Sequence, residues 1–164
     1  MISSDKLDEI IGKSNLYSEI KLMEVNIKIV ENDQEKELVL SIRKIVFIEE
    51  LNIPEYMEID NNEDLATYVL ANIGSKYVGT ARWRNTDLGI KLERFAVLSE
   101  YRSCGVGTKM TKFILKQLDH TKLIYLNAQE SAISFYEKLG FDSIGPRFDE
   151  VGIAHQKMIF PIVC

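Results

Sequence analysis

The sequence has few of the residues that build cross-linked or metal-bound proteins. Of its 164 residues only two are cysteine, Cys104 and Cys164, and only two are histidine. Two cysteines are too few for a disulfide framework, and their spacing does not fit a metal site. We therefore expect reduced cysteines in a cytoplasmic protein that needs no metal.

Long hydrophobic runs and an excess of positive charge are also absent. No apolar stretch approaches the roughly 20 residues of a membrane-spanning helix, and the N-terminal MISSDKLDEI lacks the apolar centre of a signal peptide. Twenty Lys and Arg residues stand against 25 Asp and Glu residues, a net charge of −5. Because binding to nucleic acid needs a basic face, we expect neither nucleic acid nor a membrane as partner.

Linkers rich in Pro, Gly and Ser, internal repeats and low-complexity segments are missing as well. The length suits one compact domain, and 46% hydrophobic residues can supply its core. We expect a polar lead-in over residues 1–15, with a short helix from Asp5 to Ile11, followed by a single domain over residues 16–164.

The patterns of hydrophobic residues predict a mixed α/β domain in the order β-α-β-β-β-α-β-α-β-β. A strand begins at Ile20, and a helix follows Asn32, which resembles an N-cap with Glu35 three residues later. Pro54 breaks this helix, so LNIPEYMEIDNNED is expected to be a loop. Turn residues at Gly74 and Ser75 predict a β-hairpin, and LGIKLERFAVL the next strand.

The second half of the chain repeats strand and helix signals. A helix after residue 105 places Val106, Met110, Ile114 and other apolar residues on one face. KLIYLNA is typical of a strand buried on both faces. ESAISFYEKLG predicts a helix that ends at Gly140, and FDSIGPRF and IAHQKMIF predict two closing strands.

The stretch YRSCGVGTKM, between a strand and a helix, is the strongest local signal. The first turn of a helix has unpaired N–H groups and a partial positive charge, and glycine lets a ligand approach the backbone. Arg102 adds donors suited to phosphate oxygens. These features favour a pyrophosphate at Ser103 to Thr108, although an ordinary tight turn has the same short pattern. A dinucleotide fingerprint and a P-loop both fit poorly, because Met110 and Thr108 stand where they need other residues.

The wider context resembles a known family. ERFAVLSEYRSCGVGTKM resembles the coenzyme A-binding segment of the GNAT superfamily of N-acetyltransferases, with Arg102, Gly105 and Gly107 at its motif positions. YLNAQESAISFYEKLGF resembles the strand and helix that follow in that family. IRKIVFIEELNIP and FDEVGIAH further resemble a small bacterial-type subgroup related to glucosamine-phosphate acetyltransferases.

The resemblance implies an α/β fold of the α+β mixed kind, with a central, mostly antiparallel sheet flanked by helices and splayed between strands four and five. It also implies acetyl-CoA as co-substrate. The implied cofactor-binding residues are Phe95, Ala96, Val97, Arg102, Ser103, Cys104, Gly105, Val106, Gly107, Thr108, Asn127, Gln129 and Tyr136. Backbone groups of Phe95 to Val97 would bond the pantetheine arm like an added strand, and one N–H would polarise the thioester carbonyl.

The resemblance also suggests catalytic residues. Tyr136 is the candidate general acid that donates a proton to the leaving thiolate. The alternative is that Tyr136 is only an aromatic residue of the hydrophobic core. The attacking amine must lose a proton, because an alkylammonium has a pKa near ~10.4. Glu93, Glu50 and His155 are the candidate bases. Each also has a purely structural explanation: Glu93 as a solvated strand carboxylate, Glu50 as a charge at the end of a helix, and His155 as a hydrogen-bonded strand histidine.

Three arginines on neighbouring strands are candidates for holding an acidic or phosphorylated acceptor. Arg82 and Arg84 are expected on the same face of the sheet, because side chains alternate along a strand. Arg94 is the third, and solvation at the surface is the alternative for at least one of them.

We therefore expect an acetyl-CoA-dependent N-acetyltransferase that acts on a primary amine of a small molecule by direct attack. The acceptor stays open and includes an amino sugar phosphate such as glucosamine 6-phosphate. The alternatives are a non-catalytic acyl-CoA sensor or interaction domain, and a nucleotide-dependent transferase. A homodimer is consistent with the resemblance, since dimers are common among relatives.

Overall fold

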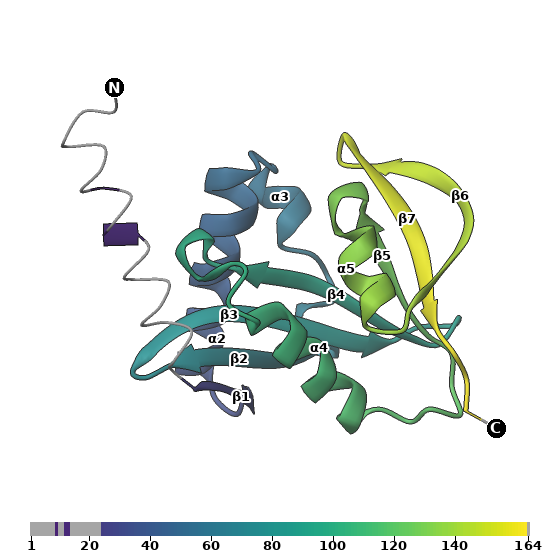
Figure 1. The fold of residues 1–164 in the computed structure, drawn as a ribbon, viewed down its shortest axis with the longest axis horizontal. Helices are drawn as coiled ribbons and strands as arrows, with labels where there is room; N and C mark the ends of the chain where they lie inside the picture. Colours follow the sequence, from purple (N-terminus) through teal and green to yellow (C-terminus); the bar gives the residue numbers. More distant parts are fainter. Residues whose placement is uncertain (1–8, 10–11, 14–23, 164) are drawn as a thin grey trace.

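A seven-stranded sheet forms the centre of the computed structural model, which describes residues 9, 12–13 and 24–163. Its strand order is β1-β2-β3-β4-β5-β7-β6, and neighbours are antiparallel except β4 and β5 (Figure 1). The strands are β1 (Val25–Ile29), β2 (Thr67–Ile73), β3 (Lys76–Asn85), β4 (Ile90–Val97), β5 (Ile124–Gln129), β6 (Asp142–Glu150) and β7 (Ile153–Phe160). The predicted mixed, mostly antiparallel sheet is confirmed.

Helices cover both faces of the sheet. On one face lie α2 (Asp33–Arg43) and η1 (Lys44–Glu50), a π-helix that continues it, and on the other lie α4 (Val106–Gln117) and α5 (Ile133–Lys138) (Figure 1). The short helices are α3 (Glu55–Glu58), η2 (Glu63–Leu65), η3 (Ser99–Tyr101) and η4 (Glu130–Ala132). Among the described helices, none has the length and apolar character needed to cross a membrane.

Alternation along the strands divides the core into two parts. Leu92 and Leu126 point to the α4 side, where they pack with Met110 and other apolar residues. Leu70 and Ala96 point to the α2 side and pack with that helix. A side chain's place in the alternation therefore decides on which side of the sheet it acts.

Several local predictions are confirmed. Asn32 caps α2, because its side chain accepts a hydrogen bond from the Glu35 amide at 2.9 Å, and Glu35 in turn accepts one from the Glu31 amide at 2.8 Å. The hairpin at Gly74 forms between β2 and β3. Gly140 has a φ of +97°, as expected for the residue that ends α5.

Two segments differ from expectation, and two expectations lie outside the described residues. The expected loop after residue 50 contains α3 and η2, and Pro54 starts α3 because its fixed φ suits the first turn of a helix. The π-helical continuation of α2 was not predicted. The lead-in helix and the first part of the strand at Ile20 fall largely outside the residues that the structure describes.

The centre of the sheet opens between β4 and β5. These strands pair only over Ile90–Leu92 and Ile124–Leu126, and then diverge. On the other edge of β4, one residue of β3 faces two residues of β4, since Thr80 pairs with Ala96 and Arg82 with Glu93. This bulge contains Arg94, whose φ is +59°. The predicted splay is confirmed, and the bulge turns the last residues of β4 toward the opening.

Candidate active site

A cavity of about 910 Å³ occupies the opening between β4 and β5. It is bordered by the start of α4, by η1 and α3, by α5 and by the β6–β7 hairpin. Its volume suits a small-molecule site, which typically measures about 300–1,000 Å³. The predicted site residues that line it are Glu50, Glu93, Phe95, Val97, Arg102, Ser103, Gly105, Val106, Gly107, Thr108, Asn127, Gln129, Tyr136 and His155.

Two predicted residues do not line the cavity. The side chain of Ala96 is buried on the α2 side of β4, although its predicted role used only backbone atoms. Cys104 lies in the turn before α4 with its Sγ 3.5 Å from the Arg102 carbonyl oxygen.

The turn before α4 presents backbone N–H groups to the cavity. Gly105 has a φ of +82° and ends the turn, and a Cβ atom there would meet nothing within 4 Å. The amides of Val106, Gly107 and Thr108 begin α4 and have no partner within the helix. At Gly107 a Cβ atom would lie 3.2 Å from the Phe135 ring, so this glycine allows α4 to pack against α5. The turn therefore offers an open group of donors at the positive end of a twelve-residue helix.

Arg102 bridges three parts of the site. Its Nε donates to the Val97 carbonyl oxygen at 3.0 Å, and its two terminal nitrogens donate to the carboxylate of Glu50. Arg102 lowers the pKa of Glu50 through these hydrogen bonds. The ion pair keeps Glu50 charged and already engaged, which makes it a weak candidate for a base.

Tyr136 projects from α5 into the aromatic side of the cavity. Its ring forms edge-to-face contacts with Phe95, Phe135 and Phe141, at centroid distances of 5.8, 4.9 and 5.7 Å. Its hydroxyl has no hydrogen-bond partner among the residues that the structure describes. Burial raises the pKa of the Tyr136 phenol, so the hydroxyl stays protonated and can act as a donor.

Glu93 lies on β4 at the cavity, but three cations surround it. Arg82 Nη2 and Arg84 Nε lie 3.0 and 2.6 Å from its Oε1, and Lys91 Nζ lies 3.4 Å from its Oε2. Burial would raise the pKa of this carboxyl, but the cations outweigh burial and lower it. Glu93 is therefore a stable anion with low affinity for a proton.

His155 has the arrangement of a proton acceptor. Its Nδ1 lies 2.7 Å from the Ile153 carbonyl oxygen, so Nδ1 carries the hydrogen and donates, which leaves Nε2 free to accept. Nε2 lies 3.5 Å from a carboxylate oxygen of Glu150, and the ring stacks on Phe148 at a centroid distance of 5.9 Å. Glu150 can stabilise the imidazolium that forms when Nε2 takes a proton.

Asn127 holds an unsatisfied polar atom. Its Oδ1 is buried and, within the described part of the chain, has no hydrogen-bond partner. Such atoms are rare in folded proteins because each costs free energy. Asn127 follows Leu126 on β5, so its side chain lies on the α2 side of the sheet and at the cavity.

A buried charge network lies behind the cavity, and it corrects the prediction for Arg82. This side chain is fully buried, and its guanidinium contacts Asp60 at 2.8 Å and Glu63 at 3.1 Å as well as Glu93. It is neither solvated nor open to an acceptor, because the carboxylates of the loop after α3 fold over it. Arg82 and Arg84 do share a face, as predicted, since both bind Glu93.

Arg43 is the second fully buried guanidinium of the network. It contacts Glu58 at 2.5 Å and Glu63 at 2.8 Å. Arg94, the third predicted arginine, lines the cavity but also contacts Asp60 at 3.3 Å and the Glu58 carbonyl oxygen at 3.2 Å. The network thus joins α2, α3 and the sheet and fixes the wall of the cavity.

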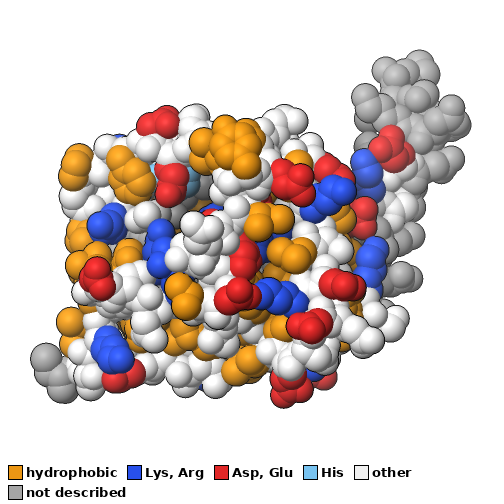
Figure 2. Space-filling model, turned by 180° about the vertical axis from the view of Figure 1, so that it is seen from behind, with side chains coloured by type: hydrophobic (Ala, Val, Ile, Leu, Met, Phe, Trp, Pro, Cys, Tyr) orange, Lys and Arg blue, Asp and Glu red, His pale blue; other side chains and the backbone are white. Residues whose placement is uncertain are grey.

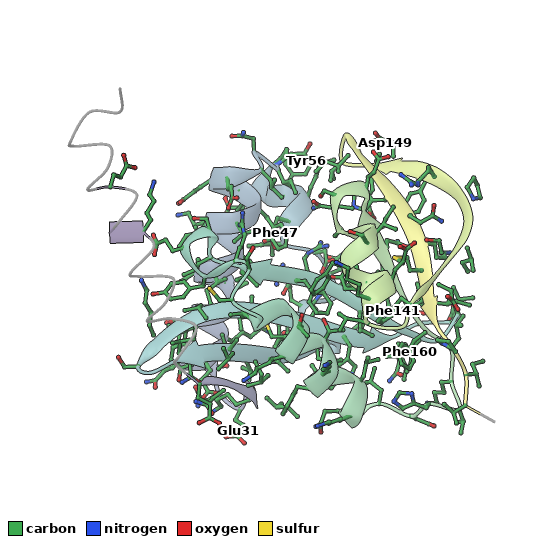
Figure 3. All side chains as sticks on the ribbon, viewed as in Figure 1. Glu31, Phe47, Tyr56, Phe141, Asp149 and Phe160 are labelled. Carbon is green, nitrogen blue, oxygen red and sulfur yellow. The ribbon has the colours of Figure 1, made fainter. Side chains whose placement is uncertain are left out.

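Most residues of one wall of the cavity were not predicted from the sequence. Its residues come from η1, the segment that follows it, α3 and the tip of the β6–β7 hairpin: Val46, Phe47, Leu51, Ile53, Met57, Glu58, Glu150 and Val151. In Figure 3, Tyr56 of α3 and Asp149 of β6 lie at the same end of the molecule. The apolar spacing in KIVFIEELNIP was a usable signal for a helix, but not for which residues border a cavity.

The arrangement can hold an extended ligand and transfer a proton at each side of it. The N–H groups before α4 suit a phosphate group, and the divergent edge of β4 suits a peptide-like arm. A protonated phenol and an imidazole with a free nitrogen stand on opposite sides of the sheet at this opening. In the described part of the chain, no group of three metal-ligating side chains is present.

Comparison with known sequences supports this interpretation. Residues 30–161 match the family described as "Acetyltransferase (GNAT) domain". The chain is 35% identical over 134 residues to the "Uncharacterized N-acetyltransferase YjcF" of Bacillus subtilis (strain 168), covering 80% of this chain and 96% of that protein. It is 32% identical over 139 residues to the "Putative acetyltransferase BSU40680" of the same organism, covering 82% of this chain and 95% of that protein.

Solved structures with a similar fold agree with this family assignment. Escherichia coli ElaA superposes with a TM-score of 0.74 at 25% sequence identity, covering 84% of this chain and 99% of that one. A putative N-acetyltransferase from Lactobacillus plantarum superposes with a TM-score of 0.76 at 21% identity, covering 85% and 99%. The second likeness supports the fold alone.

Proposed function

This chain belongs to the GNAT family of acetyltransferases, and on that premise we propose that it transfers the acetyl group of acetyl-CoA to a primary amine. The amine nitrogen attacks the thioester carbonyl directly, so that a C–N bond forms and the C–S bond breaks. Both a small amine and an amino sugar phosphate such as glucosamine 6-phosphate meet this chemical requirement. Membership of the glucosamine-phosphate subgroup stays a prediction.

The residues of the turn and of β4 are proposed to bind acetyl-CoA. The open amides of Gly105 to Thr108 and the charge of Arg102 would hold the diphosphate. The backbone of Phe95 to Val97 would bond the pantetheine arm along the divergent edge of β4, with Asn127 and Gln129 on the facing strand. Ser103 and Cys104 complete the turn, and Cys104 takes no covalent role.

His155 is the proposed base. Of the three candidates, Glu50 is paired with Arg102 and Glu93 with three cations, whereas Nε2 of His155 keeps its lone pair, with the Glu150 carboxylate 3.5 Å away. Imidazole is also the side chain that exchanges protons near neutral pH. We propose that Nε2 takes the proton of the ammonium and that Glu150 stabilises the resulting charge.

Tyr136 is the proposed acid. Its protonated hydroxyl has no competing partner in the described chain and would donate to the sulfur as the thiolate leaves. Because a phenol is a weaker acid than a thiol, the gain comes from a hydrogen bond that strengthens as charge develops.

The observation that carries the proposal is the coincidence of two features at one cavity: the open helix start at Gly105 and the parting of β4 from β5. A non-catalytic acyl-CoA sensor would share both features, and acetyl-CoA binding without turnover would favour it.

The test has two steps on the purified chain. Calorimetric titration with acetyl-CoA should give saturable one-to-one binding, and ATP should not displace it. A panel of primary amines, monitored by release of free thiol, should then contain at least one acceptor. Absence of acetyl-CoA binding would refute the proposal as a whole, and binding without turnover would replace it by the sensor.

A further inference from the structure

We infer that the acceptor is a primary amine with an apolar body and no anionic group. This inference rests on the proposed function and narrows its substrate class. It follows from the chemistry of the cavity wall formed by η1, α3 and the β6–β7 hairpin, which we call the acceptor wall. The wall consists of Val46, Phe47, Glu50, Leu51, Ile53, Met57, Glu58, Glu150, Val151 and His155.

The acceptor wall is largely apolar. Val46, Phe47, Leu51, Ile53, Met57 and Val151 are six of its ten residues. Val46 and Phe47 are buried in the α2-side core, so their side chains are held in place by packing. Leu51 and Met57 are 37% and 44% exposed, which leaves apolar surface that a ligand can cover. Burial of such surface favours an aliphatic or aromatic group.

The cations near this wall are already engaged by carboxylates. Lys91 pairs with Glu93, and Arg94 contacts Asp60 and the Glu58 carbonyl. Arg102 is held by Glu50 and would serve the diphosphate. An anionic acceptor bound to one of these cations would lie close to the carboxylate that the cation already contacts, and the two like charges would repel each other.

The wall's free polar groups suit an amine. His155 offers Nε2, Glu150 offers a half-exposed carboxylate, and both come from the hairpin. Asn127 lies outside the wall and is proposed above to face the pantetheine arm, and its unpartnered Oδ1 adds a further acceptor at the cavity. Asn127 lies diagonally across from His155 on the same face of the sheet, because Gln129 pairs with His155 and Asn127 with Lys157. These groups all accept hydrogen bonds, and an ammonium group is a pure donor.

Further apolar surface is exposed on the elements that carry the wall. Tyr56, next to Met57 on α3, is 79% exposed, and Val151, which lines the cavity at the tip of the hairpin, is 41% exposed. Figure 2, which views the molecule from the side opposite α4, shows hydrophobic side chains gathered along its upper edge, where α3 lies. An amine with an apolar body would meet hydrophobic side chains along the acceptor wall.

Three probes separate the classes: 2-phenylethylamine, ethanolamine and glucosamine 6-phosphate. With acetyl-CoA saturating, we expect kcat/KM for 2-phenylethylamine to exceed that for ethanolamine at least about 30-fold, since roughly 100 Å² of additional apolar surface is buried. Glucosamine 6-phosphate should be the poorest substrate. Equal rates for the two simple amines, or a preference for the sugar phosphate, would overturn the inference.

A variant of the wall supplies a second measurement. Met57→Asn should raise KM for 2-phenylethylamine about fivefold, with little change in kcat or in acetyl-CoA affinity. Leu88→Asn is the matched control, since Leu88 is 50% exposed in the turn before β4 and does not line the cavity. An unchanged KM in Met57→Asn would count against the acceptor wall.

The two proposals fail in different ways. If acetyl-CoA binds but 2-phenylethylamine releases no thiol, the acceptor class is wrong and the cofactor site stands. If the unmodified chain does not bind acetyl-CoA, the proposed function itself fails, and the acceptor class with it.

Discussion

Glu50 and Arg102 form a two-point ion pair that ties the end of η1 to the turn before α4. Arg102 Nη2 lies 2.7 Å from Glu50 Oε2, and Nη1 donates to Oε1 of the same carboxylate. The same arginine would serve a diphosphate, so the carboxylate and the phosphate compete for it. The acceptor wall and the cofactor turn are thus linked through one side chain.

The first prediction concerns this competition. Glu50→Gln should increase the affinity for acetyl-CoA about two- to fivefold in calorimetry, because Arg102 no longer has to leave a carboxylate. The effect is small since both side chains are partly exposed, and such pairs contribute little. Glu49→Gln removes the same charge from an exposed neighbour and is the control. A weaker affinity in Glu50→Gln would mean that Glu50 positions Arg102 rather than occupying it.

The second prediction concerns the turn. Gly105→Asp should weaken acetyl-CoA binding at least tenfold more than Gly105→Asn does. Both side chains tolerate the left-handed conformation at φ +82°, and a Cβ atom meets nothing there, so the pair differs mainly in charge. Calorimetry of both variants measures the difference. Similar affinities would move the diphosphate away from Gly105.

The third prediction concerns the leaving group. Tyr136→Phe should lower kcat about 100-fold and leave the acetyl-CoA dissociation constant and the melting temperature nearly unchanged. The hydroxyl has no partner in the described chain, so its loss should not disturb the fold. Tyr125→Phe is the opposite control, because it removes a 3.0 Å hydrogen bond to Thr86 outside the cavity. That variant should lose stability and keep its kcat. An unchanged kcat in Tyr136→Phe would remove Tyr136 from the mechanism.

The fourth prediction concerns acid sensitivity. Burial alone would raise the pKa of Glu63, but hydrogen bonds from Arg43 and Tyr68 outweigh it and lower the pKa from an ordinary 4.5 to about 2. The unfolded chain therefore binds a proton at higher pH than the folded chain. This contribution to stability is complete above about pH 4.5 and is lost as the pH falls toward 2.

Urea unfolding between pH 6 and pH 2.5 measures this contribution. We expect a loss on the order of 1–3 kcal/mol from Glu63. Glu63→Gln should be less stable at pH 6, because it leaves Arg43 partly unpaired, and should depend less on pH. The exposed Glu37→Gln is the control and should behave like the unmodified chain. An equal pH dependence in Glu63→Gln would assign the acid sensitivity to other groups.

The order of elements was predictable because each signal was local. The Asn32 cap, the Gly74 hairpin and the apolar stripe of α4 depend on residues a few positions apart, and all three are present. The glycine turn was predictable for the same reason, since a helix start needs only its own backbone. The family resemblance added the parting of β4 from β5, which no local pattern indicates.

The charge network was not predictable from local patterns. The alternating pattern of β3 suggests that Arg82 is a surface residue. In the structure it binds Asp60 and Glu63, which lie 22 and 19 residues earlier in the chain. Arg43 reads as a favourable charge at the end of α2, yet it is fully buried. The cause is the position of α3 and of the residues after it, which bring Glu58 to Arg43 and Asp60 and Glu63 to Arg82. In the sequence, Pro54 was interpreted only as the end of the preceding helix. The acceptor wall was missed for the same reason.

The short pairing of β4 with β5 leaves two strand edges inside the molecule rather than at its rim. An interior edge is protected from other protein chains by the surrounding helices, yet it can still pair with a guest of peptide-like shape. A pantetheine arm bound there would form hydrogen bonds in the gap between β4 and β5 and so connect the two halves of the sheet. Hydrogen exchange at the amides of Phe95 to Val97 should then slow when acetyl-CoA is added. The two halves of the sheet would be held rigidly together only while the ligand is bound.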